Sequence, residues 1–133
     1  MTAPAVARLE HPRAVRRLPF AETVDIASAP RATVDEPSPC LPSATSTWYE
    51  IRPSHAGLLV VDLTGSTARD AVVRLYSRPA TEASLEFIGC SSPIWNGQIA
   101  ISARVQGGET LLAQVGTTES HVGMLVVRVE LRP

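Results

Sequence analysis

The chain contains no lysine, a single asparagine and only two each of tryptophan, tyrosine and phenylalanine. Its charges nearly cancel, because the chain has 12 arginines and 13 aspartates and glutamates, which gives a net charge of -1 at pH 7. Proteins that hold nucleic acid through its phosphates need an excess of positive charge, so nucleic acid is not an expected partner. No apolar run approaches the ~20 residues of a transmembrane helix, so we expect no membrane span.

The length and composition are typical of one folded domain. Two separate cores in 133 residues would each have about half of the chain, which is close to the practical minimum. A composition with 44% hydrophobic and 19% charged residues excludes an intrinsically disordered protein. A chain of this size buries enough surface to fold without a metal or a set of disulfides. No cofactor is expected.

Residues 1–17 differ from the rest of the chain. They contain prolines and several charges but show no regular period, which predicts a flexible N-terminal arm. The segment also lacks the apolar core, about 7–15 residues long, of a secretory signal peptide. We therefore expect the folded domain to span residues 18–133.

From Leu18 onward, apolar and polar residues alternate. In 97–105, for example, Ile99 and Ile101 stand at every second position, and 122–131 repeats the pattern with leucine and valine. Such alternation predicts strands with one face on a core and the other toward water. Further strands are expected at 19–26, 47–53, 57–64, 71–77, 84–90 and 109–117.

About eight short strands without a helical period predict an all-β fold, namely a single antiparallel β-sandwich of jelly-roll type. Gly107–Gly108 precedes a strand, which predicts a hairpin at that point. The proline-rich segment 27–46 cannot donate regularly to a ladder. It is therefore expected to be a loop that crosses between the sheets.

The two cysteines are candidates for a disulfide. Cys40 lies in the proline-rich crossover and Cys90 ends a predicted strand, without the CxxC spacing of a zinc or redox site. A disulfide would tie the crossover to that strand and contribute about 4 kcal/mol in the chain-entropy model. Two buried thiols in a reducing compartment are the alternative.

No catalytic or metal-binding motif is recognisable. The chain has neither a GxSxG nor an HExxH motif, and its histidines lie in the arm and in predicted turns: His11, His55 and His121. Asp35–Glu36, Asp62 and Asp70 could supply some oxygen ligands for calcium, but such a site needs several ligands converging from one loop. We therefore expect neither an enzyme nor a metal site.

Both tryptophans are candidate binding residues. Trp48 shares a strand face with Glu50 and Arg52, so its ring could stack on a sugar or contact a partner. It could equally cover the edge of the sandwich beneath the crossover. Trp95 lies in a predicted turn beside Asn96 and is the better candidate for an exposed ring. The expected binding residues are Trp95, Trp48 and Asn96.

Six segments between Leu18 and Gly116 follow one another in a characteristic order. They are LPFAETVDIASA (18–29), EPSPC (36–40), STWYEIRPSHAGLLVVDLTGS (46–66), RDAVVRLYS (69–77), LEFIGCSS (85–92) and ETLLAQVG (109–116). A Trp-Tyr strand, a Pro/Gly turn, a Val-Asp strand, an Asp-led strand ending in Tyr and then a Cys form the shared pattern. In this order the chain resembles the bacterial pre-peptidase C-terminal domain family.

The resemblance implies a non-catalytic jelly-roll sandwich of the kind attached to secreted bacterial enzymes. Some members bind polymers such as collagen or polysaccharide, and some bind calcium. Two departures matter. Ser91, Ser92 and Pro93 stand where the family commonly has Asn-Asp-Asp, so no calcium site is carried over. Leu111 and Leu112 replace the usual tyrosines, which reduces the aromatic surface available to a polymer.

Two functions follow as alternatives. The first is a non-catalytic module that binds a polymer, a glycan or a protein partner through the loops around Trp95. The second is a structural subunit of a homo-oligomeric surface or virus-like assembly, whose copies are linked by the arm and by sheet edges. The family and the cysteines favour a secreted or cell-surface location, although no signal peptide is recognisable.

Overall fold

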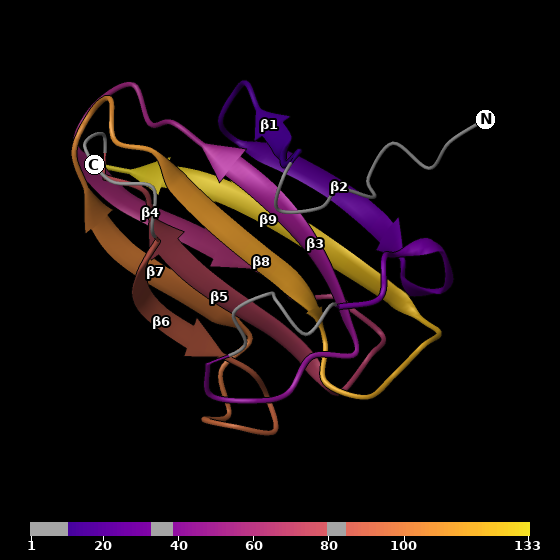
Figure 1. The fold of residues 1–133 in the computed structure, drawn as a ribbon. Coiled ribbons are helices and arrows are strands. Elements are labelled where there is room, and N and C mark those ends of the chain that lie inside the picture. The colour runs from indigo at the N-terminus through magenta and orange to yellow at the C-terminus, as the bar shows by residue number, and fades with distance from the viewer. Residues whose placement is uncertain (1–10, 33–38, 80–84) are drawn as a thin grey trace.

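The computed structural model describes residues 11–32, 39–79 and 85–133, and in these residues nine strands form two sheets. One sheet has the order β1-β3-β8-β5-β6 and the other β2-β9-β4-β7, and they lie face to face as a sandwich (Figure 1). The predicted all-β sandwich is confirmed. The strands are β1 (Arg13–Val15), β2 (Phe20–Asp25), β3 (Thr45–Ile51), β4 (Gly57–Asp62), β5 (Ala71–Ser77), β6 (Glu86–Ser91), β7 (Ala100–Val105), β8 (Leu111–Thr117) and β9 (Met124–Arg132).

Successive strands mostly alternate between the two sheets. From β2 to β9, every connection crosses from one sheet to the other except the one between β5 and β6, which are antiparallel neighbours. The crossover from β2 to β3 is the proline-rich segment, as the sequence predicts, and it includes a short 3-10 turn at Ile26–Ser28. The alternation is consistent with the predicted jelly-roll type, which stays a prediction at that level of detail.

Strand β1 lies in the segment for which the sequence predicts a flexible arm. It pairs in parallel with β3, with Arg13 opposite Tyr49 and Val15 opposite Ile51, and Val15 is buried. The arm prediction therefore needs correction at Arg13–Val15, because three residues are too few to show an alternating pattern. Residues 1–10 of the predicted arm lie outside the described residues.

The predicted hairpin at Gly107–Gly108 is wrong. The chain does turn there, with Gly108 at a φ of 84°. However, β7 before the turn pairs with β4, whereas β8 after it pairs with β3 and β5 in the other sheet. A turn signal reports that the chain reverses, but it does not specify which sheet the next strand joins.

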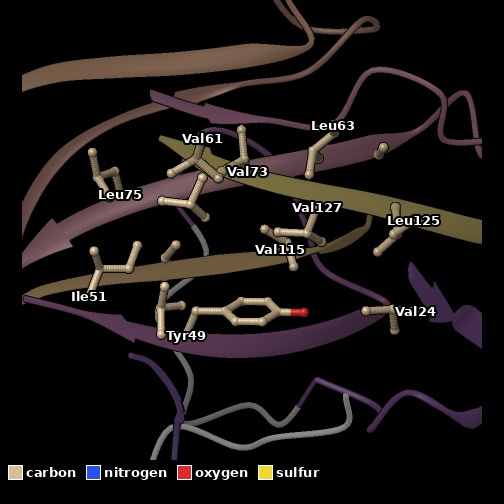
Figure 2. Packing of buried hydrophobic residues seen from close by; sticks show 14 of the residues in the cluster. Val24, Tyr49, Ile51, Val61, Leu63, Val73, Leu75, Val115, Leu125 and Val127 are labelled. Carbon is tan, nitrogen blue, oxygen red and sulfur yellow. The ribbon is translucent and has the colours of Figure 1, made fainter. Parts of the chain in front are cut away.

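Leucines, valines and isoleucines from the facing sides of both sheets form the main core (Figure 2). They stand at the alternate positions that the sequence marks as core-facing, since successive side chains of a strand point to opposite faces. Figure 2 labels Val24, Tyr49, Ile51, Val61, Leu63, Val73, Leu75, Val115, Leu125 and Val127.

A polar contact closes one edge of this core. The Tyr49 hydroxyl donates to Glu22 Oε2 at 2.7 Å, and Arg13 Nε lies 2.8 Å from Glu22 Oε1. Burial and the hydrogen bond to Glu22 raise the pKa of Tyr49 far above its usual range. Because these residues come from β3, β2 and β1, the contact joins the two sheets through paired polar groups.

The middle of the outer face of the five-stranded sheet is also buried. Across β3, β8, β5 and β6 one row of this face contains Trp48, Gln114, Arg74 and Cys90. Arg74 is fully buried, and its guanidinium donates to the crossover through Nε to Pro39 O at 2.9 Å and Nη2 to Leu41 O at 2.5 Å. Burial lowers the pKa of Arg74. The crossover is thus attached to the sheet by a buried cation.

A disulfide joins the same crossover to β6. Cys40 stands between the two carbonyls that accept from Arg74, and it is bonded to Cys90 with their Cα atoms 6.8 Å apart. The predicted disulfide is therefore confirmed, and the alternative of two free thiols is excluded. At Cys40 and its two neighbours the crossover is therefore attached to the sheet both by a disulfide and by hydrogen bonds.

Candidate functional site

Three loops gather at one end of the sandwich, where β4, β6 and β8 end and β5, β7 and β9 begin. They are 63–70, 92–99 and 118–123, and together we call them the loop end. Hydrogen bonds between loops hold them in place, such as Thr118 N to Asp70 O at 3.2 Å. Loops fixed on a rigid sheet are the usual location of binding residues.

Asp70 fixes the position of the loop between β8 and β9. Its carboxylate accepts from Glu119 N at 2.7 Å, Ser120 N at 2.8 Å and Ser120 Oγ at 2.6 Å. Burial alone would raise the pKa of Asp70, but the hydrogen bonds from Ser120 and Glu119 outweigh it and lower the pKa below its usual value. The ionised form is therefore the one that organises this loop.

Asn96 fixes the loop between β6 and β7 by accepting hydrogen bonds from backbone amides. Its side-chain oxygen accepts from Ser92 N at 3.2 Å and from Gln98 N at 3.1 Å. Gly97 follows at a φ of 73°, in the left-handed region that favours glycine. Trp95 N also donates to Ser92 O at 3.0 Å. The backbone that carries Trp95 is thus held on both sides.

Three large apolar side chains are exposed on these loops. Ile94 is 56% exposed, Trp95 54% and Val122 73%, and we call this group the apolar tip. Ile94 and Val122 line one shallow hollow of about 500 Å³, although they are far apart in the chain. The remaining lining is Thr67, Ala68, Arg69, Asp70, Thr118, Glu119 and Ser120. The loop end therefore presents apolar surface beside hydroxyl and charged groups.

The structure places two of the three expected binding residues together. Trp95 is exposed as expected, and its neighbour Asn96 supports the turn with its side-chain oxygen. Trp48 is different and requires a correction. It has no exposed surface, and its ring lies 5.5 Å from that of Tyr76 and packs with Leu112. Of the two interpretations of Trp48, only the covered one fits, because the middle of the outer face of its sheet is buried.

The candidate calcium ligands have other partners or lie outside the described residues. Asp62 Oδ1 accepts from Thr64 N at 2.8 Å and Thr64 Oγ1 at 2.6 Å, and Asp70 is held by the neighbouring loop. Asp35 and Glu36 belong to the part that is not described. In the described part of the chain, no group of three or more His, Cys, Asp or Glu side chains could hold a metal ion.

Sequence analysis missed Ile94 and Val122. Each is a single apolar residue inside a turn, next to Pro93 and Gly123 respectively. Isolated apolar residues in turns are common and carry no signal by themselves. Only the folded chain brings these two to one hollow.

Neither a scan against family models nor a search of curated proteins matches this chain. The resemblance to the pre-peptidase C-terminal domain family stays a hypothesis that rests on the segments quoted above. Among the described residues, no helix has the length and apolar character needed to cross a membrane.

Proposed function

We propose that the protein is a non-catalytic module that binds a polysaccharide through the loop end, with Trp95 as the central contact. The observation that carries this proposal is the exposed Trp95 ring on a turn fixed by Asn96. A fixed turn loses little conformational entropy on binding, so more of the contact free energy is available for affinity. Central aromatic residues commonly contribute the largest share of that free energy.

The surroundings of Trp95 favour a sugar over a purely apolar ligand. A sugar ring has an apolar face that stacks on an aromatic side chain and a rim of hydroxyls that need hydrogen-bond partners. The hollow beside the apolar tip offers such partners in the exposed charged groups of Arg69 and Glu119. Arginine donates and glutamate accepts, so both roles of a sugar hydroxyl can be met.

Fluorescence titration with soluble polysaccharides tests the proposal. The probes are dextran and xylan as neutral chains and alginate and hyaluronan as acidic chains. Binding of at least one should shift the emission of the exposed Trp95, since Trp48 is already shielded from water. Trp95→Ala should weaken that binding by about 1 kcal/mol or more, which is about fivefold in Kd.

Ile88→Ala is the matched control, because Ile88 is an exposed apolar side chain on β6 outside the loop end. Its Kd should equal that of the wild type. If all four polysaccharides leave the emission unchanged, or if Ile88→Ala weakens binding as much as Trp95→Ala, the proposed function is wrong.

The edge of the five-stranded sheet favours a structural subunit as the second candidate. Among the described strands, β6 has a neighbour on one side only, and on it Phe87 is 47% and Ile88 43% exposed. Ile88 forms a β-bulge: Leu75 of β5 pairs with Gly89 and Tyr76 pairs with Phe87, so Ile88 has no partner residue on β5. Exposed edges with apolar side chains favour pairing with another chain. A second copy added at β6 would build the homo-oligomer that this candidate requires.

A further inference from the structure

A second hollow lies at the opposite end of the sandwich from the loop end. It has a volume of about 450 Å³, which is within the usual range for small-molecule sites. The connections from β1 to β2 and from β3 to β4 line it together with the end of β9. The lining residues are Val15, Arg16, Arg17, Leu18, Pro19, Arg52, Ser54, His55, Glu130 and Leu131.

The charge around this hollow is strongly one-sided. Arg16, Arg17 and Arg52 are exposed at it, and within the described ranges none of them has an ion-pair partner. The carboxylate of Glu130 is already paired, because its Oε1 accepts from Arg132 Nε at 2.6 Å. Three arginines without an ion-pair partner among the described residues thus line one concave surface, in a protein whose net charge is only -1.

The geometry points to a binding site for a small organic oxyanion with two or more charges, such as a polycarboxylate or a phosphate ester. Guanidinium groups bind planar or tetrahedral oxyanions through paired N–H donors, and such charge-assisted bonds are stronger than neutral ones. The hydroxyl of Ser54 adds a further donor. Apolar lining from Leu18, Pro19 and Leu131 provides a surface for the carbon skeleton of the ligand.

Three like charges around one hollow repel one another, and an anion between them removes that repulsion. The hollow is also larger than a bare phosphate or sulfate ion requires, which favours an anion that carries carbon atoms. The proposal does not depend on polysaccharide binding at the loop end, because the two sites share no residue.

Citrate and inorganic phosphate are the probes, titrated into the full disulfide-bonded chain at constant ionic strength with sodium chloride as the reference. Two-dimensional NMR should show saturable shifts of backbone amides in 16–18, 52–56 and 130–132, with citrate binding more tightly than phosphate. Arg17→Gln and Arg52→Gln should each weaken citrate binding by about tenfold, the effect of losing one charge-assisted contact.

Arg104→Gln is the matched control, because Arg104 is an exposed arginine on β7 that lines neither hollow. It should leave citrate affinity unchanged. Shifts no larger than those in sodium chloride, shifts centred on the loop end, or an equal loss in Arg104→Gln would each overturn the proposed oxyanion site. All three arginines replaced here are exposed, so the variants are expected to fold.

Discussion

Asp70 illustrates how one side chain determines the shape of a loop that it does not belong to. It precedes β5, yet its carboxylate accepts hydrogen bonds from the backbone amides of Glu119 and Ser120, which lie 49 and 50 positions later in the chain. Those amides would otherwise lack partners inside the protein. The position of Val122, two residues further on, therefore depends on an ionised carboxylate.

We expect Asp70→Asn to destabilise the protein by about 1–2 kcal/mol at pH 7, because an amide oxygen is a weaker acceptor than a carboxylate. The folded state lowers the pKa of Asp70, so its stabilising effect is present above the usual carboxyl range and disappears as the pH falls through the lowered value. The difference between wild type and Asp70→Asn should therefore narrow below about pH 4. Urea unfolding of both proteins at several pH values measures this difference in unfolding free energy.

Asp62→Asn serves as the control for this prediction, because within the described part of the chain the Asp62 carboxylate accepts from its near neighbour Thr64 alone. Its destabilisation should be smaller than that of Asp70→Asn. An equal loss in the two variants, or a difference that stays constant down to pH 2, would contradict the assigned role of Asp70.

At the scale of elements, the attachment of the proline-rich crossover determines which surfaces of the five-stranded sheet are exposed. Arg74 holds the carbonyls on either side of Cys40, and Cys40 is bonded to Cys90 in the neighbouring strand. Trp48 lies in the same row and is fully buried. The sequence of β3 alternates as if one face were exposed to water, but in the structure the side chains of Trp48 and Tyr49, on its two faces, are both buried.

Removal of the disulfide by Cys40→Ala with Cys90→Ala should lower the stability by about 4 kcal/mol, because the unfolded chain regains the freedom of a long loop. Denaturant unfolding of this variant should match that of reduced wild-type protein.

In a Trp95→Phe background the fluorescence emission comes from Trp48 alone and should move to longer wavelength if the crossover detaches. An unchanged unfolding midpoint after reduction would show that Arg74 and packing suffice without the disulfide.

At the scale of the whole molecule, the N-terminal segment belongs partly to the sandwich. Val15 is buried in the core and Arg13 pairs with Glu22, so β1 extends the five-stranded sheet beside β3. Among the described strands, the two edges of that sheet are therefore the three-residue β1 and the longer β6. An assembly that uses sheet edges could pair with β6, with the short β1 or with an edge of the four-stranded sheet, but not with β3, because β1 already occupies that side of β3.

Two deletions separate the structural and the assembly roles of the N-terminus. Deletion of residues 2–17 removes β1 and should destabilise the fold by about 2 kcal/mol, the effect of exposing one core valine. Deletion of residues 2–10 leaves β1 intact and should preserve stability. If the arm links copies, the shorter deletion should nevertheless reduce the native mass measured by light scattering.

Ile88→Lys tests the other route to assembly, since a charge on β6 disfavours edge pairing. The native mass of the wild type must be measured first, because a monomeric wild type would make the structural-subunit candidate wrong. An oligomer that resists both the 2–10 deletion and Ile88→Lys would exclude both the arm and the β6 edge as its links.

Local patterns along the chain suffice for most of the strands. Alternation of polar and apolar residues is a property of neighbouring positions, because successive side chains of a strand point to opposite faces. It located all the strands from β2 to β9 to within a few residues. It failed at Arg13–Val15, which is too short to show a period, and the prolines and charges of residues 1–17 suggested a flexible arm instead.

The sequence by itself determined the all-β class, the strands from β2 to β9, the crossing loop and an exposed Trp95, because each depends on residues close together in the chain. Tertiary structure decided what depends on distant residues: the sheet that β8 joins, the burial of Trp48, and the pairing of Cys40 with Cys90. The same holds for both hollows, since each is lined by several separate segments. Hydrophobic burial is non-directional, so the pattern of one strand does not specify which distant strand or loop covers it.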